Sequence, residues 1–508
     1  MSFLSADERA LATALSRVGY ANPFLPKRIE AERAALGRDF IHAEHVWSVR
    51  TDRTVQNPNV ARLAERAATL ATRLRERLMG GATPPEPDRV LYEDVVLYLL
   101  YARHEDDLLA LVLTSAEPGE TGRRVPFYEK FRADCQHFLD LPGVARRHDP
   151  DHLFACLFQV RRAFHHIFWH IIGGSMSMAR LRAAVWQSIF THDMRRYRRA
   201  LYQRMDDVTT LIVGPSGTGK ELVARAIGLS RYIPFDARSG RFAAHSGDLF
   251  HPLNLSALSP TLIESELFGH RRGAFTGALQ DRAGWLETCE PFGTVFLDEI
   301  GDVEPAIQVK LLRVLQTRTF ERLGDTKPLV FRGKIMAATN RDLGREIRAG
   351  HFREDFYYRL CSDIIATPSL AEQLRESPGE LPNLVLFLAR RLVGDEEAGA
   401  LADEAHAWIE RHLGSSYPWP GNVRELEQCV RNVLIRGEYR PATGGDGRPA
   451  DDLAGALRAG ALTADQLLAR YCALVYAETE SYQETARRLG LDRRTVKSKV
   501  AQYRIDGR

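Results

Sequence analysis

Apolar residues recur three and four positions apart through much of the first 165 residues. This helical spacing predicts three helices, over Ala6–Val18, Pro58–Met79 and Tyr92–Leu113. Asn57 stands where it can cap the second helix, and Gly80 with Gly81 would end it. Strand patterns are not evident here. We therefore expect residues 1–165 to form a mostly helical sensory or regulatory domain, whose signal the sequence does not disclose.

The hydrophobic pattern changes beyond about residue 166. Apolar runs of strand length appear at Leu211–Val213, Phe250–Leu255, Thr294–Leu297 and Lys334–Thr339. Helical spacing is found at Met178–Ile189, which Ser175 can cap, and at Glu221–Ser230 and Ala306–Gln316. These segments predict an α/β domain over 166–435, with a core at about 166–370 and a small helical lid at about 371–435. We expect Asn422 to cap a helix of the lid.

Beyond the lid, residues 436–460 are rich in Gly, Ala and Pro and predict a linker, in which Asp451–Ala459 has helical character. Helical runs follow at Thr463–Glu478, at Tyr482–Leu489 and after Asp492, with Gly490 in the turn. This is a helix-turn-helix layout over 461–508. From residue 481 onward there are eight basic and three acidic residues. The candidate DNA contacts are Arg487, Arg493, Arg494, Thr495, Lys497, Ser498 and Lys499, and a solvated basic helix is the alternative.

Composition narrows the class of protein. The chain has 508 residues, 44% of them hydrophobic and 27% charged, which fits several domains of a soluble protein. Its six cysteines contain no C-x-x-C spacing, so neither a disulfide framework nor a zinc site is indicated. Charges near the start and the absence of a long apolar run predict a cytoplasmic protein without a membrane span. His165, His166 and His170 invite a metal site, but no third ligand is placed by spacing, so we favour a packed aromatic helix.

The strongest chemical signal is a glycine-rich loop between a strand and a helix, in LIVGPSGTGKE at 211–221. Its glycines allow backbone N–H groups to face an anion, and Lys220 adds a charge for the β- and γ-phosphates. The candidate nucleotide-binding residues of the loop are Gly214, Pro215, Ser216, Gly217, Thr218, Gly219, Lys220 and Glu221. Because Glu221 stands where a hydroxyl ligand of Mg²⁺ is usual, phosphate, water, Asp298 or Thr218 would hold the ion. An ordinary tight turn is the alternative.

Polar residues follow the other predicted strands. Asp298 and Glu299 end one strand, where Asp298 would hold Mg²⁺ through water and Glu299 would polarise the attacking water. Asn254 ends another and can either bond a catalytic carboxylate or cap the strand. Asn340 is placed to sense the γ-phosphate. Arg353 and Arg359 are either solvated or able to act on a neighbouring subunit, and Arg424 is placed to reach a nucleotide from the lid.

The segment between these motifs is hard to assign to a core. Gly273, Ala274, Phe275, Thr276, Gly277 and Ala278 place one large aromatic residue between two glycines. A mobile loop that presents Phe275 to a partner explains this composition, and a buried hairpin tip is the alternative.

These motifs resemble one family together. GPSGTGKELVARAI, ESELFGHRRGAFTGA, GTVFLDEIGDV, ATNRDL, FREDFYYRL and YPWPGNVRELE are similar to the AAA+ domain of bacterial enhancer-binding proteins, the ATPase activators of sigma-54 RNA polymerase. The resemblance covers roughly 170–435. The last domain resembles the Fis-type helix-turn-helix of such activators.

The resemblance implies a ring, expected to be a hexamer, that uses ATP and Mg²⁺ to remodel the closed complex of the sigma-54 RNA polymerase holoenzyme while bound to enhancer DNA. It implies that residues 273–278 contact sigma-54, that Asn254 restrains Glu299, and that Arg353 and Arg359 act in trans. Pro215 replaces a usual acidic residue, and a longer span near 232–248 suggests an inserted loop. Two alternatives remain: an AAA+ remodeller of another protein and a regulator in which nucleotide only controls DNA binding.

Overall fold

The structure, a computed structural model, describes residues 3–42, 57–114, 124–142, 144, 149–244, 249–441, 462–479 and 481–506. The chain divides into two compact units, Met1–Tyr439 and Arg440–Arg508. None of the helices in the described ranges is both long and apolar enough to cross a bilayer. The expected class is confirmed: a helical N-terminal region, an α/β domain with a helical lid, and an all-helical C-terminal unit.

The N-terminal region is built from helices only, within its described residues. They are α1 (Ala6–Tyr20), α2 (Pro26–Leu36), α3 (Pro58–Met79), α4 (Glu86–Arg103), α5 (Glu105–Thr114), α6 (Tyr128–Leu139) and α7 (Pro150–His170). Helix α3 has the expected bounds, and the side chain of Asn57 accepts a hydrogen bond from the backbone N–H of Asn59. The single helix expected over Tyr92–Leu113 was wrong. The chain breaks at His104, whose buried ring bonds Asp134 of α6 at 2.9 Å.

A five-stranded parallel sheet forms the centre of the α/β domain. Its order is β4 (Phe250–Asn254), β5 (Thr294–Asp298), β8 (Lys334–Thr339), β1 (Thr210–Val213) and β9 (Asp363–Ala366). Alternate side chains of a strand enter opposite cores. In β5, Val295 and Leu297 pack on one face of the sheet and Phe296 packs on the other.

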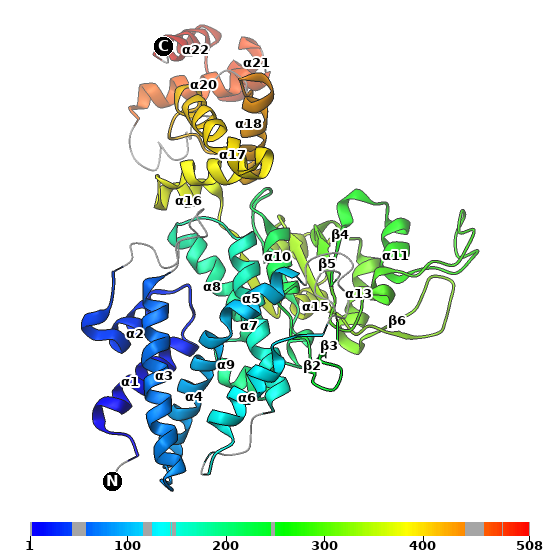
Figure 1. The fold of residues 1–508 in the computed structure, drawn as a ribbon. Coiled ribbons are helices and arrows are strands. Elements are labelled where there is room, and N and C mark those ends of the chain that lie inside the picture. Colours follow the sequence, from blue (N-terminus) through cyan, green and yellow to red (C-terminus); the bar gives the residue numbers. More distant parts are fainter. Residues whose placement is uncertain are drawn as a thin grey trace. The chain divides into compact units, whose positions relative to one another are not determined.

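Helices cover both faces of this sheet (Figure 1). Phe296 packs on the side of α7, α8 (Met176–Phe190) and α10 (Lys220–Gly228), and Val295 on the side of α11 (Pro260–Phe268), α13 (Pro305–Thr317) and α15 (Glu354–Leu360). Short helices α9 (Met194–Arg196), α12 (Trp285–Thr288) and α14 (Leu343–Arg348) complete the domain. As expected, Ser175 caps α8 by accepting a bond from the N–H of Met178.

The domain boundary expected at residue 165 falls inside helix α7. This helix therefore spans the end of the N-terminal region and the start of the α/β domain. Its Gln159 side chain donates to the carbonyl of Ser230 at 3.0 Å. The fully buried guanidinium of Arg162 donates to the carbonyls of Leu229 and Arg231. Carbonyls at a helix C-terminus lack partners within the helix. Helix α7 therefore supplies donors to the end of α10, the helix that begins with Lys220.

Two hairpins of the domain are formed by short paired strands. The first, β2 (Phe235–Asp236) paired with β3 (Arg241–Phe242), lies within the expected insertion at 232–248, of which 245–248 are outside the described residues. The second joins β6 (Thr319–Phe320) to β7 (Leu329–Val330). Phe235 and Phe242 of the first hairpin pack into the core of the N-terminal helices. The insertion is therefore a contact between the two regions.

The lid consists of α16 (Leu370–Glu376), α17 (Glu380–His412), which bends at Gly394, and α18 (Asn422–Arg436). In the C-terminal unit, α20 (Ala464–Thr479), α21 (Tyr482–Leu489) and α22 (Arg493–Asp506) pack around Cys472, Val496 and Val500. Gly490 makes the turn between α21 and α22 with φ 64°. The helical character expected at Asp451–Ala459 lies outside the described residues.

Candidate nucleotide-binding site

The glycine-rich loop leaves β1 and enters α10 as the sequence predicts. Gly214, Gly217 and Gly219 have positive φ angles of 152°, 77° and 85°. Residues with a side chain rarely adopt such angles. A Cβ on Gly214 would overlap the side chain of Thr367, and one on Gly217 would overlap the carbonyl of Gly421 in the lid. The loop is therefore a cradle of bare backbone at a helix N-terminus, the arrangement that binds phosphate.

The loop lysine lies against the acidic pair. Lys220 is buried, and its Nζ donates to the carbonyl of Gly214 at 3.1 Å. The same Nζ is 3.9 Å from Oε1 of Glu299. Residues almost 80 positions apart in the sequence thus meet at the carboxyl edge of the sheet, as their motifs predict.

Asp298 and Glu299 form the acidic end of β5. The N–H of Glu299 donates to Oδ1 of Asp298 at 3.0 Å, and Oε2 of Glu299 accepts from the N–H of Asn340 at 3.2 Å. Burial, and then the neighbouring charge of Glu299, raises the pKa of Asp298 above its usual value. A carboxylate whose charge is disfavoured in this way gains from a divalent cation beside it. The donor set therefore fits the expected Mg²⁺.

Of the two roles expected for Asn254, a bond to a catalytic carboxylate or a cap at the end of its strand, the structure shows the cap. Asn254 lies beside Asp298 in the register of β4 and β5. Its Oδ1 accepts bonds from the N–H and the hydroxyl of Ser256, at 3.0 and 2.8 Å. The side chain therefore caps the turn after the strand in this structure, and restraint of Glu299 by Asn254 stays a prediction.

Thr218 and Glu221 of the loop are both engaged elsewhere. The hydroxyl of Thr218 bonds the carbonyl of Pro215 at 2.8 Å and the hydroxyl of Thr367 at 2.7 Å. The carboxylate of Glu221 pairs with Arg225 at 3.0 Å. Lys220, Asp298 and Glu299 are therefore the charged groups that the core of the domain brings to the loop.

The lid contacts the loop through two residues of α18. Nη1 of Arg424 donates to the hydroxyl of Ser216 at 3.2 Å, which places this arginine over the loop as expected. Asn422 was expected only as a helix cap, and that expectation was wrong. With φ 54°, its Nδ2 donates to the carbonyl of Ser216 at 2.9 Å and its Oδ1 accepts from the N–H of Leu370 at 2.8 Å. Asn422 thus ties the start of the lid to the phosphate loop.

The two arginines of α15 lie at the surface of the domain. Arg353 forms an ion pair with Asp355 at 2.7 Å and is 44% exposed. Arg359 is also exposed and donates to the carbonyl of Leu315 at the end of α13. Both side chains are held in defined positions on a solvent-facing helix.

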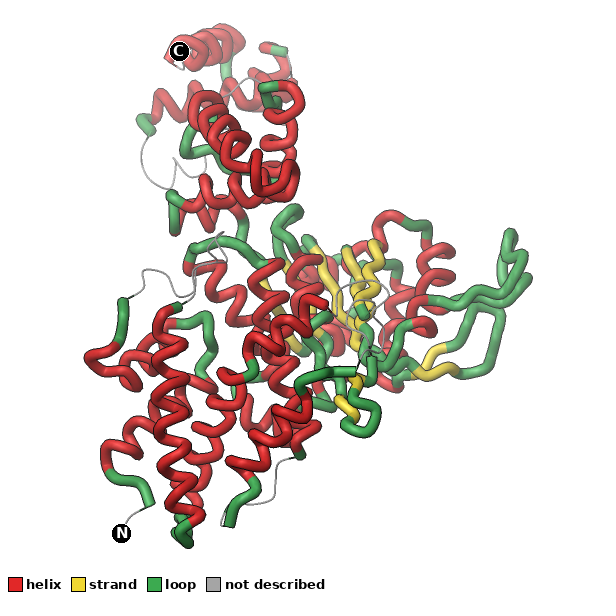
Figure 2. Tube along the Cα trace, viewed as in Figure 1, coloured by secondary structure: helices red, strands yellow, loops and turns green. Residues whose placement is uncertain are grey.

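Residues 273–278 form the tip of a hairpin. The strands of its base meet at a bridge between His270 and Arg282, and the N–H of Gly273 donates to the carbonyl of Ala278 at 2.8 Å. Phe275 is half-buried, with its ring centre 5.0 Å from that of His270. The hairpin runs beside the β6–β7 loop, to which Arg271 is joined through Asp325 at 2.8 Å (Figure 2). A projecting hairpin thus carries a covered aromatic side chain.

The candidate DNA contacts differ in their surroundings. Arg493, Arg494, Lys497 and Ser498 are exposed on α22, and Thr495 is half-buried. Arg487 is 77% exposed beside Glu484. Lys499 instead pairs with Asp465 of α20 and is 17% exposed, so it helps to hold the helices together.

The histidines of α7 lie among aromatic rings. The ring of His165 stacks on Trp169 at 5.8 Å and that of His166 on His170 at 6.0 Å. Within the described ranges, no group of three or more potential ligands is placed to hold a metal ion.

Comparison with known proteins agrees with this geometry. Residues 189–365 match the family model described as the sigma-54 interaction domain. This part of the chain is thus similar to sigma-54 interaction domains. Over 230 residues the chain is 46% identical to the Nif-specific regulatory protein of Azotobacter vinelandii, covering 45% of this chain and 40% of that protein. Over 232 residues it is 45% identical to the sigma54-dependent transcriptional activator SfnR of Pseudomonas putida, covering 45% and 57%.

The chain thus spans about half the length of the curated relatives that it matches. Among solved structures, NtrX from Brucella abortus in complex with ATP aligns with a TM-score of 0.39 and 23% identity, over 74% of this chain and 80% of NtrX. The stretch that matches the sigma-54 interaction domain, residues 189–365, includes β1, the phosphate loop, the acidic pair and the 273–278 hairpin.

Proposed function

We propose that this protein is a sigma-54-dependent transcriptional activator, in which ATP hydrolysis drives the 273–278 hairpin against the sigma-54 RNA polymerase holoenzyme. The observation that carries the proposal is the meeting of Lys220 with Glu299 in the same domain that extends this hairpin. The name of one relative, the sigma54-dependent transcriptional activator SfnR, supports the same function, and the other is named as a regulatory protein.

The hydrolytic chemistry follows from the residues at the loop. Backbone N–H groups of residues 214–219 and the ammonium of Lys220 bind the phosphates and oppose the negative charge that develops during transfer. Glu299 orients a water molecule and draws its proton during attack. Mg²⁺, held through water by Asp298, supplies further positive charge when it is bound. Asn340 and Arg424 sense the γ-phosphate from the sheet and the lid.

Arginines on α15 support a ring. Arg353 and Arg359 are exposed on one short helix, where a neighbouring copy of the chain can receive them. An arginine supplied in trans stabilises transition-state charge and makes hydrolysis depend on assembly. A closed ring of copies, a hexamer in this proposal, gives every subunit such a neighbour.

The C-terminal unit supports binding to enhancer DNA. Its exposed cations Arg493, Arg494 and Lys497 lie at the start of the helix that follows the Gly490 turn. In helix-turn-helix proteins, the corresponding helix enters the major groove with its first residues against the bases.

The test is promoter opening by full-length protein on a sigma-54 promoter with its enhancer, with ATPase activity measured in the same samples. We expect Phe275→Ala to keep ATPase activity within about twofold and to lose promoter opening. In the proposal the Phe275 side chain contacts the polymerase and takes no part in hydrolysis. Phe275→Tyr is the matched control and keeps both activities. Glu299→Gln should bind ATP but lose both activities by roughly 10²-fold or more. Opening by Phe275→Ala at the wild-type level would overturn the proposal.

A further inference from the structure

A large cavity lies where the N-terminal helices meet the nucleotide-binding domain. Its volume is about 1740 Å³, which exceeds the roughly 300–1,000 Å³ usual for a small-molecule site. Helices α3, α4, α5 and α7 line much of it, and Leu222 of α10 and Phe387 of α17 line one end. The cavity thus touches the regulatory region, the helix of the phosphate loop and the lid.

The walls of the cavity are aromatic. Phe164 and Trp186 pack against each other with ring centres 4.8 Å apart. Phe168 and Trp169, one turn further along α7, are 38% and 48% exposed. Exposed aromatic rings inside a concave site offer flat apolar surface to a ligand.

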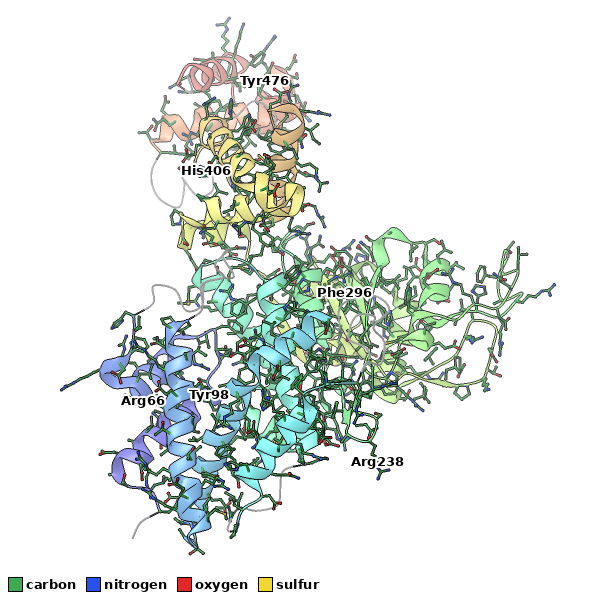
Figure 3. The ribbon with its side chains drawn as sticks, in the orientation of Figure 1. Arg66, Tyr98, Arg238, Phe296, His406 and Tyr476 are labelled. Atoms are coloured by element: carbon green, nitrogen blue, oxygen red, sulfur yellow. The ribbon has the colours of Figure 1, made fainter. Side chains whose placement is uncertain are left out.

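At the N-terminal end, the charged groups of the cavity are largely neutralised. Arg28 pairs with Glu32 at 2.7 Å and Arg161 pairs with Glu105 at 2.8 Å, while Asp94 pairs with Arg195. Tyr98 lies among these groups on α4 (Figure 3). This end therefore offers little net charge.

The opposite end, which we call the basic end, is formed by Arg225 of α10 with Arg390 and Arg391 of α17. The carboxylates beside them, Glu221 and Asp395, are 47% and 91% exposed. Three guanidinium groups thus stand against two solvent-exposed carboxylates, which leaves one net positive charge at this end.

The positive charges of the basic end also affect the pKa of His170. Burial, then the charge of Arg225, and further those of His165 and Arg391, lower the pKa of His170 to about 4. His170, which also lines the cavity, is therefore neutral at pH 7 and adds no charge to this corner.

We propose that the basic end of this cavity binds a small organic anion with a flat apolar body, and that this anion is the signal that sets the ATPase activity of the ring. The carboxylate, sulfonate or phosphate of such a ligand would bind Arg225 and Arg391, and its ring would pack on Trp169. The regulatory part rests on the proposed function, whereas the binding part does not.

The position of the basic end explains how a ligand would act. Arg225 is one turn after Lys220 on α10, and Arg391 belongs to the lid, whose residue Asn422 bonds the phosphate loop. An anion bound by both arginines fixes the distance between the lid and the loop helix. In this proposal that distance differs between the ATP-bound and the ATP-free states, so affinity for ATP changes with occupancy of the cavity, and by linkage ATP changes the affinity for the anion by the same factor.

The experiment uses full-length protein and 1-anilinonaphthalene-8-sulfonate, an aromatic anion whose fluorescence rises in an apolar site, with saturating ATP present to cover the nucleotide site. We expect saturable binding that 2-naphthoate displaces and that 2-naphthalenemethanol, the uncharged analogue, displaces at least about tenfold less well. Arg391→Ala should weaken probe affinity by about tenfold. The matched control, Arg411→Ala, removes an exposed arginine near the other end of α17 and should change affinity by less than twofold.

Equal displacement by the two naphthalene compounds, or equal affinity in the two arginine variants, would overturn the site. Arg391→Glu, which reverses the charge, should abolish probe binding, and retained binding in that variant would overturn it too. Probe binding is measured by fluorescence and does not depend on ATP hydrolysis. The proposed binding site would therefore still be supported if the proposed ATPase function were wrong. Binding without any effect of 2-naphthoate on ATP affinity would overturn the regulatory role.

Discussion

The ring of Phe235, in the hairpin that follows the phosphate-loop helix, lies 4.5 Å from the ring of Tyr128 in the N-terminal region. Phe154 is 4.8 Å from the same Phe235 ring, and the N–H of Val125 donates to the carbonyl of Gly240 at 2.9 Å. An insertion of the α/β domain thus completes the core of the N-terminal region. The two regions therefore share one packed core at this contact.

We predict that Phe235→Ala destabilises the N-terminal region by about 3–5 kcal/mol, because the substitution removes a buried ring from an aromatic cluster. Urea denaturation followed by circular dichroism measures the change. Arg238→Ala, at the exposed tip of the same hairpin (Figure 3), is the control and should cost less than about 0.5 kcal/mol. Similar costs for the two substitutions would show that the hairpin does not support the region.

Asn422→Ala should weaken ATP binding by about tenfold, or about 1.4 kcal/mol. The substitution removes the bonds to Ser216 and Leu370 and places alanine at φ 54°, a conformation that it resists. Nucleotide titration by calorimetry gives the affinity. Asn432→Ala removes an amide that bonds only within α18 among the described contacts, and it should bind ATP as the wild type does.

Asp298→Asn should stabilise the nucleotide-free protein at pH 7. The folded-state pKa of Asp298 is raised, so above that pKa the ionised group costs folding free energy, and the cost disappears as the pH falls and the folded protein takes up a proton first. The gain in Tm should therefore be largest at neutral pH and shrink toward pH 4.

The control for this prediction is Asp281→Asn. Its carboxyl has a lowered pKa, because it accepts from the N–H of Arg272 and pairs with Arg271. Removing that charge should lower Tm at neutral pH, which is the opposite sign. Equal responses of the two variants would contradict the assignment at Asp298.

Arg494→Ala should weaken DNA binding by the C-terminal unit within the full chain and reduce the slope of log affinity against log salt by about one. Lys499→Ala should leave that slope unchanged and instead lower folding stability, because Lys499 pairs with Asp465. Filter binding at several salt concentrations separates the two effects.

Local sequence patterns were sufficient to predict a feature when the residues that specify it lie in one segment. The bounds of α3 follow from Asn57, its apolar spacing and Gly80, and the loop from Gly214 to Lys220 is specified by its own glycines. The acidic pair was located because a buried run ends in two carboxylates, and parallel strands bring such ends to one edge.

Features that depend on distant partners could not be predicted. Phe235 and Phe242 stand in a polar, glycine-containing stretch, and their partners lie about 80 to 110 residues earlier in the chain. The two long-range bonds of Asn422 leave no local pattern, and β9 is a short edge strand with Ile365 as its buried member. The break at His104 depends on Asp134 of another helix, which periodicity in α4 and α5 cannot report.

Helix α7 also determines where the chain must be cut to remove the N-terminal region. A fragment that begins at residue 166 discards Gln159 and Arg162, and with them the donors for the carbonyls of Leu229, Ser230 and Arg231. Any change in its ATPase activity would then reflect unpaired carbonyls just after α10 as well as the missing region. A cut just before Pro150, joined with polar replacements for Phe235 and Phe242, keeps that anchor and isolates the effect of inhibition or stimulation itself.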